Sequence, residues 1–209
     1  MATFLLLGIA AVCIAIFIQR KSPAWIGRNG EKYVSEKLYK LDPTHYKIHN
    51  DIMLLSKGNS VATQIDHIVV SNYGIFCIET KAYKGWIFGN ANQDQWTQVI
   101  FRYKGRFYNP LRQNFAHISA IKDLLGAQRL KKPVVSLIVF SVADKLKISG
   151  TDSVGYARDI VRKIGSYTEP VFSDAERDEI YNLIAAANII NKEARNLHIR
   201  EVRNLKLCR

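Results

Sequence analysis

Hydrophobic and polar residues follow each other along most of this chain in patterns that predict strands and helices. Alternation and short apolar runs predict strands at residues 46–54, 63–70, 74–81, 96–103, 106–108 and 133–141. Helical spacing and helix-start residues predict helices at 29–41, 110–129, 152–164 and 174–195. This order of helix, strands, helix, strand and helices predicts a mixed α/β domain.

The N-terminal segment differs from the rest because residues 2–18 are apolar throughout. A run of this length is at the lower limit for a helix that spans a membrane. A signal peptide is disfavoured, since no Lys or Arg precedes the run and no Ala-x-Ala cleavage site closes it. Arg20, Lys21, Arg28 and Lys32 all follow the run, so the positive-inside rule places the domain on the cytoplasmic side.

These patterns predict three parts. We expect a single-pass transmembrane anchor at residues 1–20, a core at 21–145, and a C-terminal helical extension packed on that core at 146–209. The formal net charge of +12 predicts polyanionic partners, and both nucleic acid and anionic lipid fit that charge. The three cysteines have no spacing typical of a disulfide framework or a zinc cluster.

The two predicted strands that are joined by the turn at residues 71–74 bring acidic residues together. Alternate residues of a strand share a face, and a tight turn fixes which residues of the two strands are opposed. Asp66 then lies across from Glu79, and Gln64 across from Lys81, with opposed Cβ atoms about 5 Å apart. We therefore expect two carboxylates and one ammonium at the same end of this hairpin.

Two adjacent carboxylates repel each other, and a divalent cation between them removes that repulsion. Oxygen ligands of this kind suit magnesium or manganese. Such a metal polarises a phosphodiester and lowers the pKa of a bound water, while Lys81 orients that water or stabilises charge on the phosphate. The alternative interpretation is a surface salt bridge between Lys81 and one of the carboxylates.

Four short segments carry a more specific pattern. They are Gly27-x-x-Gly30-Glu31, Gln64-Ile65-Asp66-His67-Ile68, Ile78-Glu79-Thr80-Lys81, and Asn109-Pro110-Leu111-x-Gln113-Asn114 with His117 after it. In this order and spacing they resemble the nuclease-related domain (NERD) family of the PD-(D/E)XK nuclease superfamily. The resemblance covers about residues 25–140. One departure is that Ile65, rather than proline, precedes Asp66.

The resemblance implies a restriction-endonuclease-like core, with helices on either side of a mixed central sheet, and magnesium-dependent hydrolysis of DNA. It implies metal ligation by Asp66, Glu79 and the backbone carbonyl of Thr80, and it makes Lys81 the catalytic lysine. It also implies that Glu31, on the first helix, faces the same site. The alternative function is a membrane-tethered protein that binds nucleic acid, or acts as a scaffold, without cutting.

Other polar residues of these segments admit two interpretations. Gln64 either holds a phosphate or water in the site or lies at a solvated strand edge. His67 lies on the face opposite to the carboxylates, which favours a structural role. Gln113 and Asn114 open a helix, where they either cap it or position substrate. His117 shares a helix face with Gln113, and packing is the favoured role for it.

The predicted hairpin at residues 96–108, with its turn at Lys104-Gly105, alternates aromatic and basic side chains. The aromatic residues are Trp96, Phe101, Tyr103, Phe107 and Tyr108, and the basic ones are Arg102, Lys104 and Arg106. Stacking combined with positive charge suits nucleic acid. A half-buried hairpin with one face in water would carry the same pattern. The basic tail at 191–209 contacts phosphate or anionic lipid, or is a solvated face.

Overall fold

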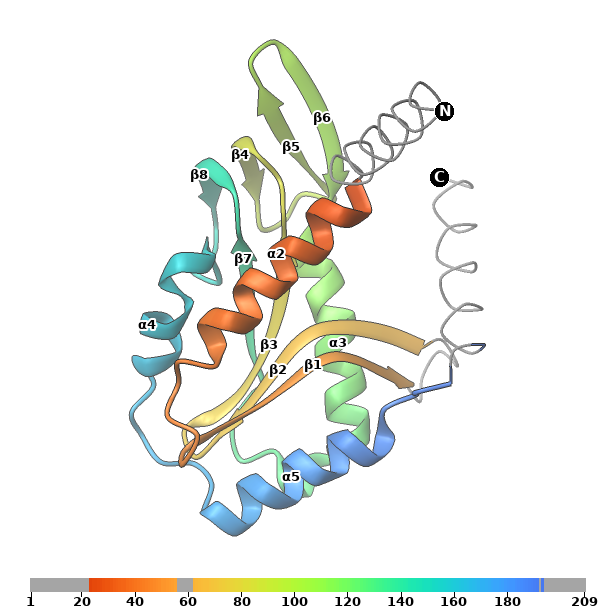
Figure 1. The fold of residues 1–209 in the computed structure, drawn as a ribbon, viewed down its shortest axis with the longest axis vertical. Helices are drawn as coiled ribbons and strands as arrows, with labels where there is room; N and C mark the ends of the chain where they lie inside the picture. Colours follow the sequence, from red (N-terminus) through yellow and green to blue (C-terminus); the bar gives the residue numbers. More distant parts are fainter. Residues whose placement is uncertain (1–22, 56–61, 192, 194–209) are drawn as a thin grey trace, which may run out of the picture.

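The structure, a computed structural model, describes residues 23–55, 62–191 and 193 of the chain. The predicted anchor at residues 1–20 and nearly all of the basic tail lie outside the described residues. Within the described part, no helix is long and apolar enough to cross a membrane. The expected mixed α/β architecture is confirmed for the described residues, which form two sheets with helices around them (Figure 1).

The first sheet has five strands in the order β1-β2-β3-β7-β9. Their bounds are β1 (Tyr46–Leu55), β2 (Ala62–Ser71), β3 (Gly74–Lys81), β7 (Val135–Phe140) and β9 (Val154–Tyr156). The pairs β1–β2 and β2–β3 are antiparallel, whereas β3–β7 and β7–β9 are parallel. Strand β3 is therefore central, which explains why it is buried along nearly its whole length.

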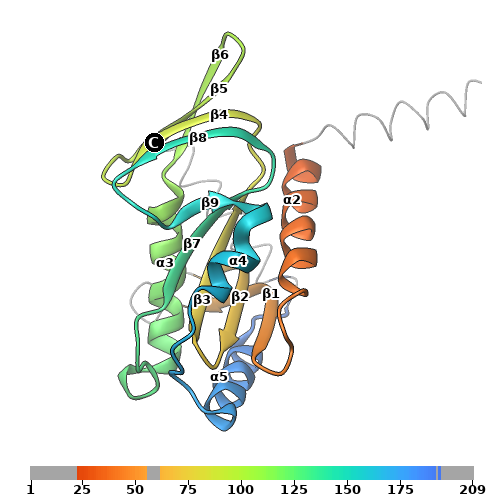
Figure 2. The ribbon, with the colours of Figure 1, turned by 90° about the vertical axis from the view of Figure 1, so that its left-hand side faces the viewer.

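Helices cover both faces of this sheet (Figures 1 and 2). Their bounds are α2 (Pro23–Leu38), α3 (Pro110–Leu125), α4 (Ile160–Gly165) and α5 (Asp174–Ala187). Alternate residues of β3 serve the two faces: Ile75 and Cys77 pack with α3 and α5, while Phe76 and Ile78 pack with α2 and α4. The core thus forms two apolar layers, one on each side of the sheet.

The second sheet has four strands in the order β6-β5-β4-β8. Their bounds are β4 (Gly85–Asn90), β5 (Gln95–Ile100), β6 (Tyr103–Tyr108) and β8 (Ala143–Ser149). Figure 1 shows this sheet beyond the upper ends of β3 and β7, with the β5–β6 hairpin projecting furthest. Ile87 and Trp96 pack against Ile138 and Phe140 of β7, so a small third core joins the two sheets.

Several sequence-based expectations about this region are wrong. Strands β4 and β8 were not predicted. The turn of the β5–β6 hairpin lies at Phe101-Arg102 instead of Lys104-Gly105, because Gly105 pairs with Gln98 inside the ladder. Trp96 is fully buried and Phe107 packs beside it, so neither is available for stacking on a ligand.

The C-terminal part also differs from the expectation of helices alone. The helix predicted at 152–164 is reduced to residues 160–165, because Val154 to Tyr156 pair with β7 as a short strand. Strand β8 joins the second sheet in parallel with β4. Helix α5 begins at the predicted capping box of Ser173 and Glu176 but ends at Ala187, earlier than expected.

The predicted register of the β2–β3 hairpin is confirmed from Ser71–Gly74 up to the pair His67–Ile78. Pairing ends there, one step before Asp66 and Glu79. On β1, Asp51 has a φ of 54°, and this left-handed conformation coincides with a change of face. Ile48 packs on the α2 side of the sheet, whereas Ile52 packs on the α3 side. The β1–β2 ribbon therefore twists away at the level of Asp66.

Candidate functional site

The candidate site lies at the end of β3, where β2 stops pairing with it. The backbone N–H of Thr80 would otherwise lack a partner on β2, and it donates to Asp66 Oδ2 at 2.7 Å. The Asp66 carboxylate thus replaces a backbone carbonyl at the point where the strands separate. This hydrogen bond fixes the Asp66 side chain beside β3 and leaves its second oxygen for another partner.

Glu79 is the centre of the site and is only 2% exposed. One carboxylate oxygen, Oε1, lies 2.5 Å from Lys81 Nζ, and the other, Oε2, lies 3.1 Å from His117 Nε2. Both contacts are to side chains that are themselves mostly buried. The surface salt bridge considered for Lys81 is therefore excluded, because the ion pair that forms is largely shielded from water.

Helix α3 supplies a second set of polar groups. Lys81 Nζ donates to Gln113 Oε1 at 2.9 Å, and His117 lies on the same helix face one turn later. The other ring nitrogen of His117, Nδ1, is 2.6 Å from Thr63 Oγ1, so its imidazole is held between β2 and Glu79. Gln113 and His117 consequently belong to the site, although packing was the favoured role for His117.

The N-terminal end of α3 is fixed by buried amides. Asn109 caps the helix by accepting from the Leu111 N–H at 2.9 Å. Asn114, fully buried, donates to the Cys77 carbonyl at 3.0 Å and to Ser136 Oγ at 2.8 Å. Asn114 therefore has a structural role: it attaches α3 to β3 and β7 and sets the position of Gln113 and His117.

Helix α2 approaches the end of the sheet through Gly30. A Cβ built on Gly30 would lie 2.8 Å from Ser141 Oγ and 2.9 Å from Ala82 Cβ, which is too close for any larger residue. The next residue, Glu31, is half-buried, and its pKa is raised by burial first and then by the charges of Asp51 and Glu79. The structure thus brings Glu31 into the electrostatic field of the site.

The ionisable side chains of the site differ in how their surroundings shift their pKa values. The pKa of Asp66 is raised well above its usual value, chiefly by burial and then by the neighbouring charge of Glu79. Burial alone would also raise the pKa of Glu79, but Lys81 and His117 outweigh it and lower that pKa. Burial would lower the pKa of Lys81, yet Glu79 and Asp66 raise it. Asp66 is therefore the carboxylate that lacks a compensating cation.

Two other residues of the sequence motifs lie away from this centre. Gln64 is exposed and donates to Asp51 Oδ1 at 2.7 Å, so it lies at the rim, beside the carboxylate that also acts on Glu31. The buried His67 ring contacts Asn50 Oδ1 at 2.7 Å on the other side of β2. Burial lowers the pKa of His67 to about 4, which fits a neutral, structural histidine.

The oxygen donors of the site set which metal could bind there. No three His, Cys, Asp or Glu side chains of the described residues could together hold an ion. Asp66 and Glu79 provide two oxygen ligands, and magnesium commonly uses one or two carboxylates with water and substrate phosphate completing its shell. The carboxylate of Asp66 is balanced by less positive charge than that of Glu79, and carboxylate oxygens are hard ligands. Both properties suit a divalent cation.

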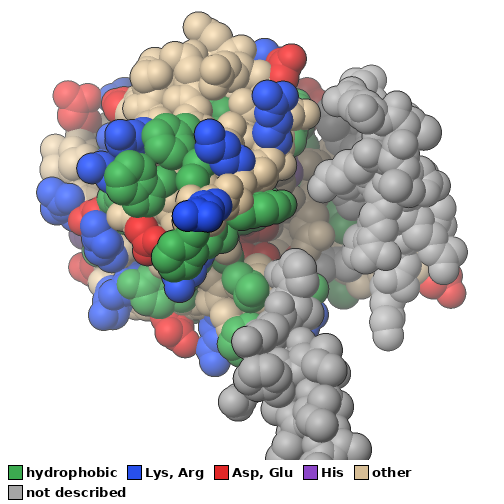
Figure 3. Space-filling view, turned by 90° about the horizontal axis from the view of Figure 1, so that it is seen from above, with side chains coloured by type: hydrophobic (Ala, Val, Ile, Leu, Met, Phe, Trp, Pro, Cys, Tyr) green, Lys and Arg blue, Asp and Glu red, His purple; other side chains and the backbone are tan. Residues whose placement is uncertain are grey.

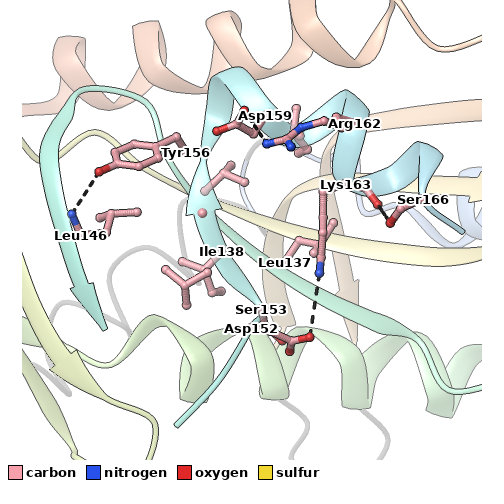
Figure 4. Close-up of a pocket in the computed structure, with 14 residues that line it drawn as sticks. Leu137, Ile138, Leu146, Asp152, Ser153, Tyr156, Asp159, Arg162, Lys163 and Ser166 are labelled. Carbon is pink, nitrogen blue, oxygen red and sulfur yellow. Dashed lines mark hydrogen bonds and ion pairs between the residues drawn. The ribbon is translucent and has the colours of Figure 1, made fainter. Parts of the chain in front are cut away.

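A cavity of about 440 Å³ lies elsewhere, between β7, β9 and α4 (Figure 4). Its walls are mainly apolar. At its rim Arg162 pairs with Asp159, and Lys163 with Asp152. None of the acidic residues of the candidate site lines this cavity, so the cavity and the candidate site lie in different parts of the fold. Chemistry identifies the site, because at the end of β3 two carboxylates, a lysine and a histidine lie together and are largely shielded from water.

Comparison with known proteins agrees with this assignment. The sequence profile of the nuclease-related domain matches residues 26–141, which include every site residue from Glu31 to His117. An uncharacterized protein of Bacillus anthracis is 38% identical over 192 residues, covering 90% of this chain and 88% of the relative. No solved structure matches the chain. The chain therefore belongs to the nuclease-related domain (NERD) family, consistent with the PD-(D/E)XK nuclease superfamily.

Proposed function

We propose that this protein is a metal-dependent nuclease that hydrolyses phosphodiester bonds of DNA. The observation that carries the proposal is the arrangement of Asp66, Glu79 and Lys81 beside the end of β3, where Glu79 is almost fully buried and Asp66 and Lys81 are partly buried. Placing two carboxylates side by side and largely out of water is costly, and a protein keeps such a pair mainly where it has a use for the charge. Membership in the nuclease-related domain family supports this reading.

The cofactor in this proposal is magnesium or manganese. Asp66 and Glu79 would hold it with the backbone carbonyl of Thr80, a residue whose N–H already fixes Asp66. When bound, the ion supplies Lewis-acid polarisation of the phosphate and a water of lowered pKa. Glu79 would then exchange part of its contact with Lys81 for the metal, which frees the ammonium for substrate.

The remaining residues act on the substrate or on the carboxylates. Lys81, charged and held by Gln113, is placed to stabilise negative charge on the phosphate in the transition state. Glu31 extends the acidic side of the site, and because burial raises its pKa it holds a proton more readily than an ordinary glutamate does. His117 orients Glu79 and keeps its oxygens from turning away.

The location of the enzyme is part of the same proposal. The apolar run at residues 2–18, followed by basic residues, supports a single-pass anchor with the domain on the cytoplasmic side of a membrane. Chromosomal or invading DNA is accessible on that side. The alternative function is binding of nucleic acid without cutting, by a protein tethered to the membrane. The formal net charge of +12 supports this function equally.

A cleavage assay with the full-length chain tests the proposal. Labelled DNA is incubated with magnesium or with EDTA, using wild type, Glu79→Gln, and Glu36→Gln as a matched control. Glu36 is an exposed helix residue paired only with Lys32. We expect metal-dependent cleavage by wild type and the control, and a loss of at least 100-fold in Glu79→Gln. Binding without any metal-dependent cleavage would instead support the non-catalytic alternative.

A further inference from the structure

The second sheet has an outer face with an unusual composition. Strand pairing places Ile87, Trp96 and Leu146 on the inner face, where they enter the third core. The alternate positions form the outer face, which includes the aromatic residues Trp86 and Phe88 and the cations Lys104, Arg106, Lys145 and Lys147. None of the outer-face positions paired in this register is Asp or Glu.

Two of these cations lie against the aromatic rings. Lys145 Nζ and Lys147 Nζ lie 5.2 and 5.1 Å from the centroid of the Trp86 ring, and Lys147 Nζ is 5.5 Å from that of Phe88. Trp86 is nevertheless 44% exposed, which is high for a tryptophan in the middle of a sheet. Seen from the end where this sheet lies, hydrophobic side chains are bordered by lysines and arginines (Figure 3).

Within the described part of the chain, the four cations of this face lack acidic partners. Among the described residues, none of Lys104, Arg106, Lys145 and Lys147 forms an ion pair with a carboxylate, whereas Arg112, Lys131 and Lys132 nearby in the chain all do. Four like charges on one sheet face repel each other, and an extended polyanion lying across them would relieve that repulsion.

We propose that the outer face of the second sheet binds a single-stranded segment of nucleic acid, with bases on Trp86 and Phe88 and phosphates on the surrounding cations. Exposed aromatic rings on a sheet face can stack only with bases that are unpaired, and a duplex keeps its bases inside. Anionic lipid is disfavoured, because inserting the Trp86 ring among acyl chains would also take the two ammonium groups beside it out of water, which is costly.

The face is connected to the candidate site at both ends. Strand β4 begins at Gly85, four positions after Lys81, and β6 leads directly through Asn109 into α3, which carries Gln113 and His117. Asn109 also donates to the carbonyls of Ala91 and Gln93 in the β4–β5 turn, at 3.1 and 2.6 Å. The second sheet is therefore attached on both sides to the elements that carry the site residues. The biological use of this binding face rests on the proposed nuclease function, whereas the binding experiment below does not require cleavage.

Binding is measured on the full-length chain in EDTA, where no metal-dependent cleavage occurs. The probe is a short fluorescein-labelled strand of mixed sequence, compared by anisotropy with the same strand in a duplex. The variants are Trp86→Ala, Trp86→Phe and Lys145→Ala/Lys147→Ala. The matched control, Lys40→Ala/Lys122→Ala, removes the same charge from exposed positions just after the end of α2 and in the last turn of α3.

We expect wild type and the control pair to bind the single strand more tightly than the duplex. Trp86→Ala should weaken single-strand binding roughly tenfold, and Trp86→Phe should restore most of it, because either ring can stack. The double lysine variant should lower the salt slope of log K by about 1.4, as for two lost phosphate contacts. Equal binding by all variants, or a preference for the duplex that survives them, would overturn the proposal.

Two further results separate this proposal from its neighbours. If the wild type binds the single strand in this way but never cleaves DNA with magnesium, the outer-face proposal stands and the nuclease proposal fails. If Lys145→Ala/Lys147→Ala loses binding to phosphatidylserine vesicles while it keeps full binding to the single strand, the face is a lipid surface and the proposal is wrong. Thermal melting of each variant confirms that it is folded.

Discussion

The Asp66 carboxylate accepts a hydrogen bond from the Thr80 backbone N–H at 2.7 Å, at the first position where β2 and β3 no longer pair. The Asp66 side chain therefore replaces a backbone carbonyl as acceptor, and the strands can separate without leaving the Thr80 N–H unsatisfied. The opening creates the space between β2, β3 and α3 in which Glu79, Lys81 and His117 meet.

This relationship predicts opposite effects of Asp66→Asn on the metal-free and metal-bound protein. Asn keeps an acceptor for the Thr80 N–H but removes a charge that is costly beside Glu79. We expect the variant to melt a few degrees higher than wild type in EDTA at neutral pH. Magnesium should raise the melting temperature of wild type only. A variant that melts lower in EDTA would show that ionised Asp66 stabilises the fold.

The difference in stability between wild type and Asp66→Asn should depend on pH, because the pKa of Asp66 is raised in the folded state. Protonated Asp66 favours the folded state fully when the pH is below the pKa of the unfolded state. This contribution to stability is lost as the pH rises through the pKa of the folded state. In EDTA the stability advantage of Asp66→Asn should therefore grow from acidic toward neutral pH. Chemical denaturation at several pH values measures it, and an advantage that shrinks over this range would contradict the assignment.

Lys81→Met should affect both activity and stability. It leaves Glu79 buried without its nearest cation, and breaking a buried pair costs about 3 kcal/mol or more. Cleavage should fall by about 100-fold or more, since the charge that faces the phosphate is lost. Lys132→Met is the control, because its ion pair with Glu169 is exposed and its loss should barely change urea denaturation. Similar denaturation curves for the two variants would argue against a buried pair.

His117 should act through Glu79. Its Nε2 is 3.1 Å from Glu79 Oε2, and side chains that orient a metal ligand typically change activity or metal affinity by about 10–100-fold. We expect His117→Ala to lower the apparent affinity for magnesium in the cleavage assay by a factor within that range. His117→Gln keeps a hydrogen-bond donor of similar reach, so it should recover part of the lost affinity. An equal loss in both variants, with KM for magnesium unchanged, would mean that the imidazole has another role.

The two glycines of the first motif should respond differently to alanine. At Gly30 a Cβ would lie within 3 Å of Ser141 and Ala82, so Gly30→Ala should destabilise the protein by about 1–3 kcal/mol. At Gly27 no atom lies within 4 Å of such a Cβ, and the residue is helical. Gly27→Ala should stabilise the protein by about 0.5–1 kcal/mol. Urea denaturation of both variants checks the pair, and equal effects would mean that α2 does not approach the sheet through Gly30.

The sequence predicted the hairpin that carries the site because turn geometry and strand alternation are local properties. The register from Ser71–Gly74 to His67–Ile78 is confirmed, and it brings Asp66 to the level of Glu79. The contacts of Gln113 with Lys81 and of His117 with Glu79 were not predictable in this way. They depend on how α3 is rotated against the sheet, which is set by the distant Asn114 contacts with β3 and β7.

The second sheet shows the same limit. Strands β4 and β8 are short, pair in parallel, and are separated by more than fifty residues, so neither alternation nor a turn signal connects them. The alternation of aromatic and basic residues at 96–108 fitted both nucleic-acid stacking and a half-buried hairpin, and strand pairing places Trp96 and Phe107 on the inner face, as in a half-buried hairpin. The spacing of Gln113 and His117 on one helix face was the one signal that could have linked α3 to the site.

Titration with manganese, followed by electron paramagnetic resonance, tests most directly whether Asp66 and Glu79 share one divalent cation. Free and bound manganese are counted for wild type, Asp66→Asn, Glu79→Gln and the Glu36→Gln control in the full-length chain. The account predicts one bound manganese per chain in wild type and in the control, with binding weakened at least tenfold in each site variant. Equal binding by all four proteins would contradict it.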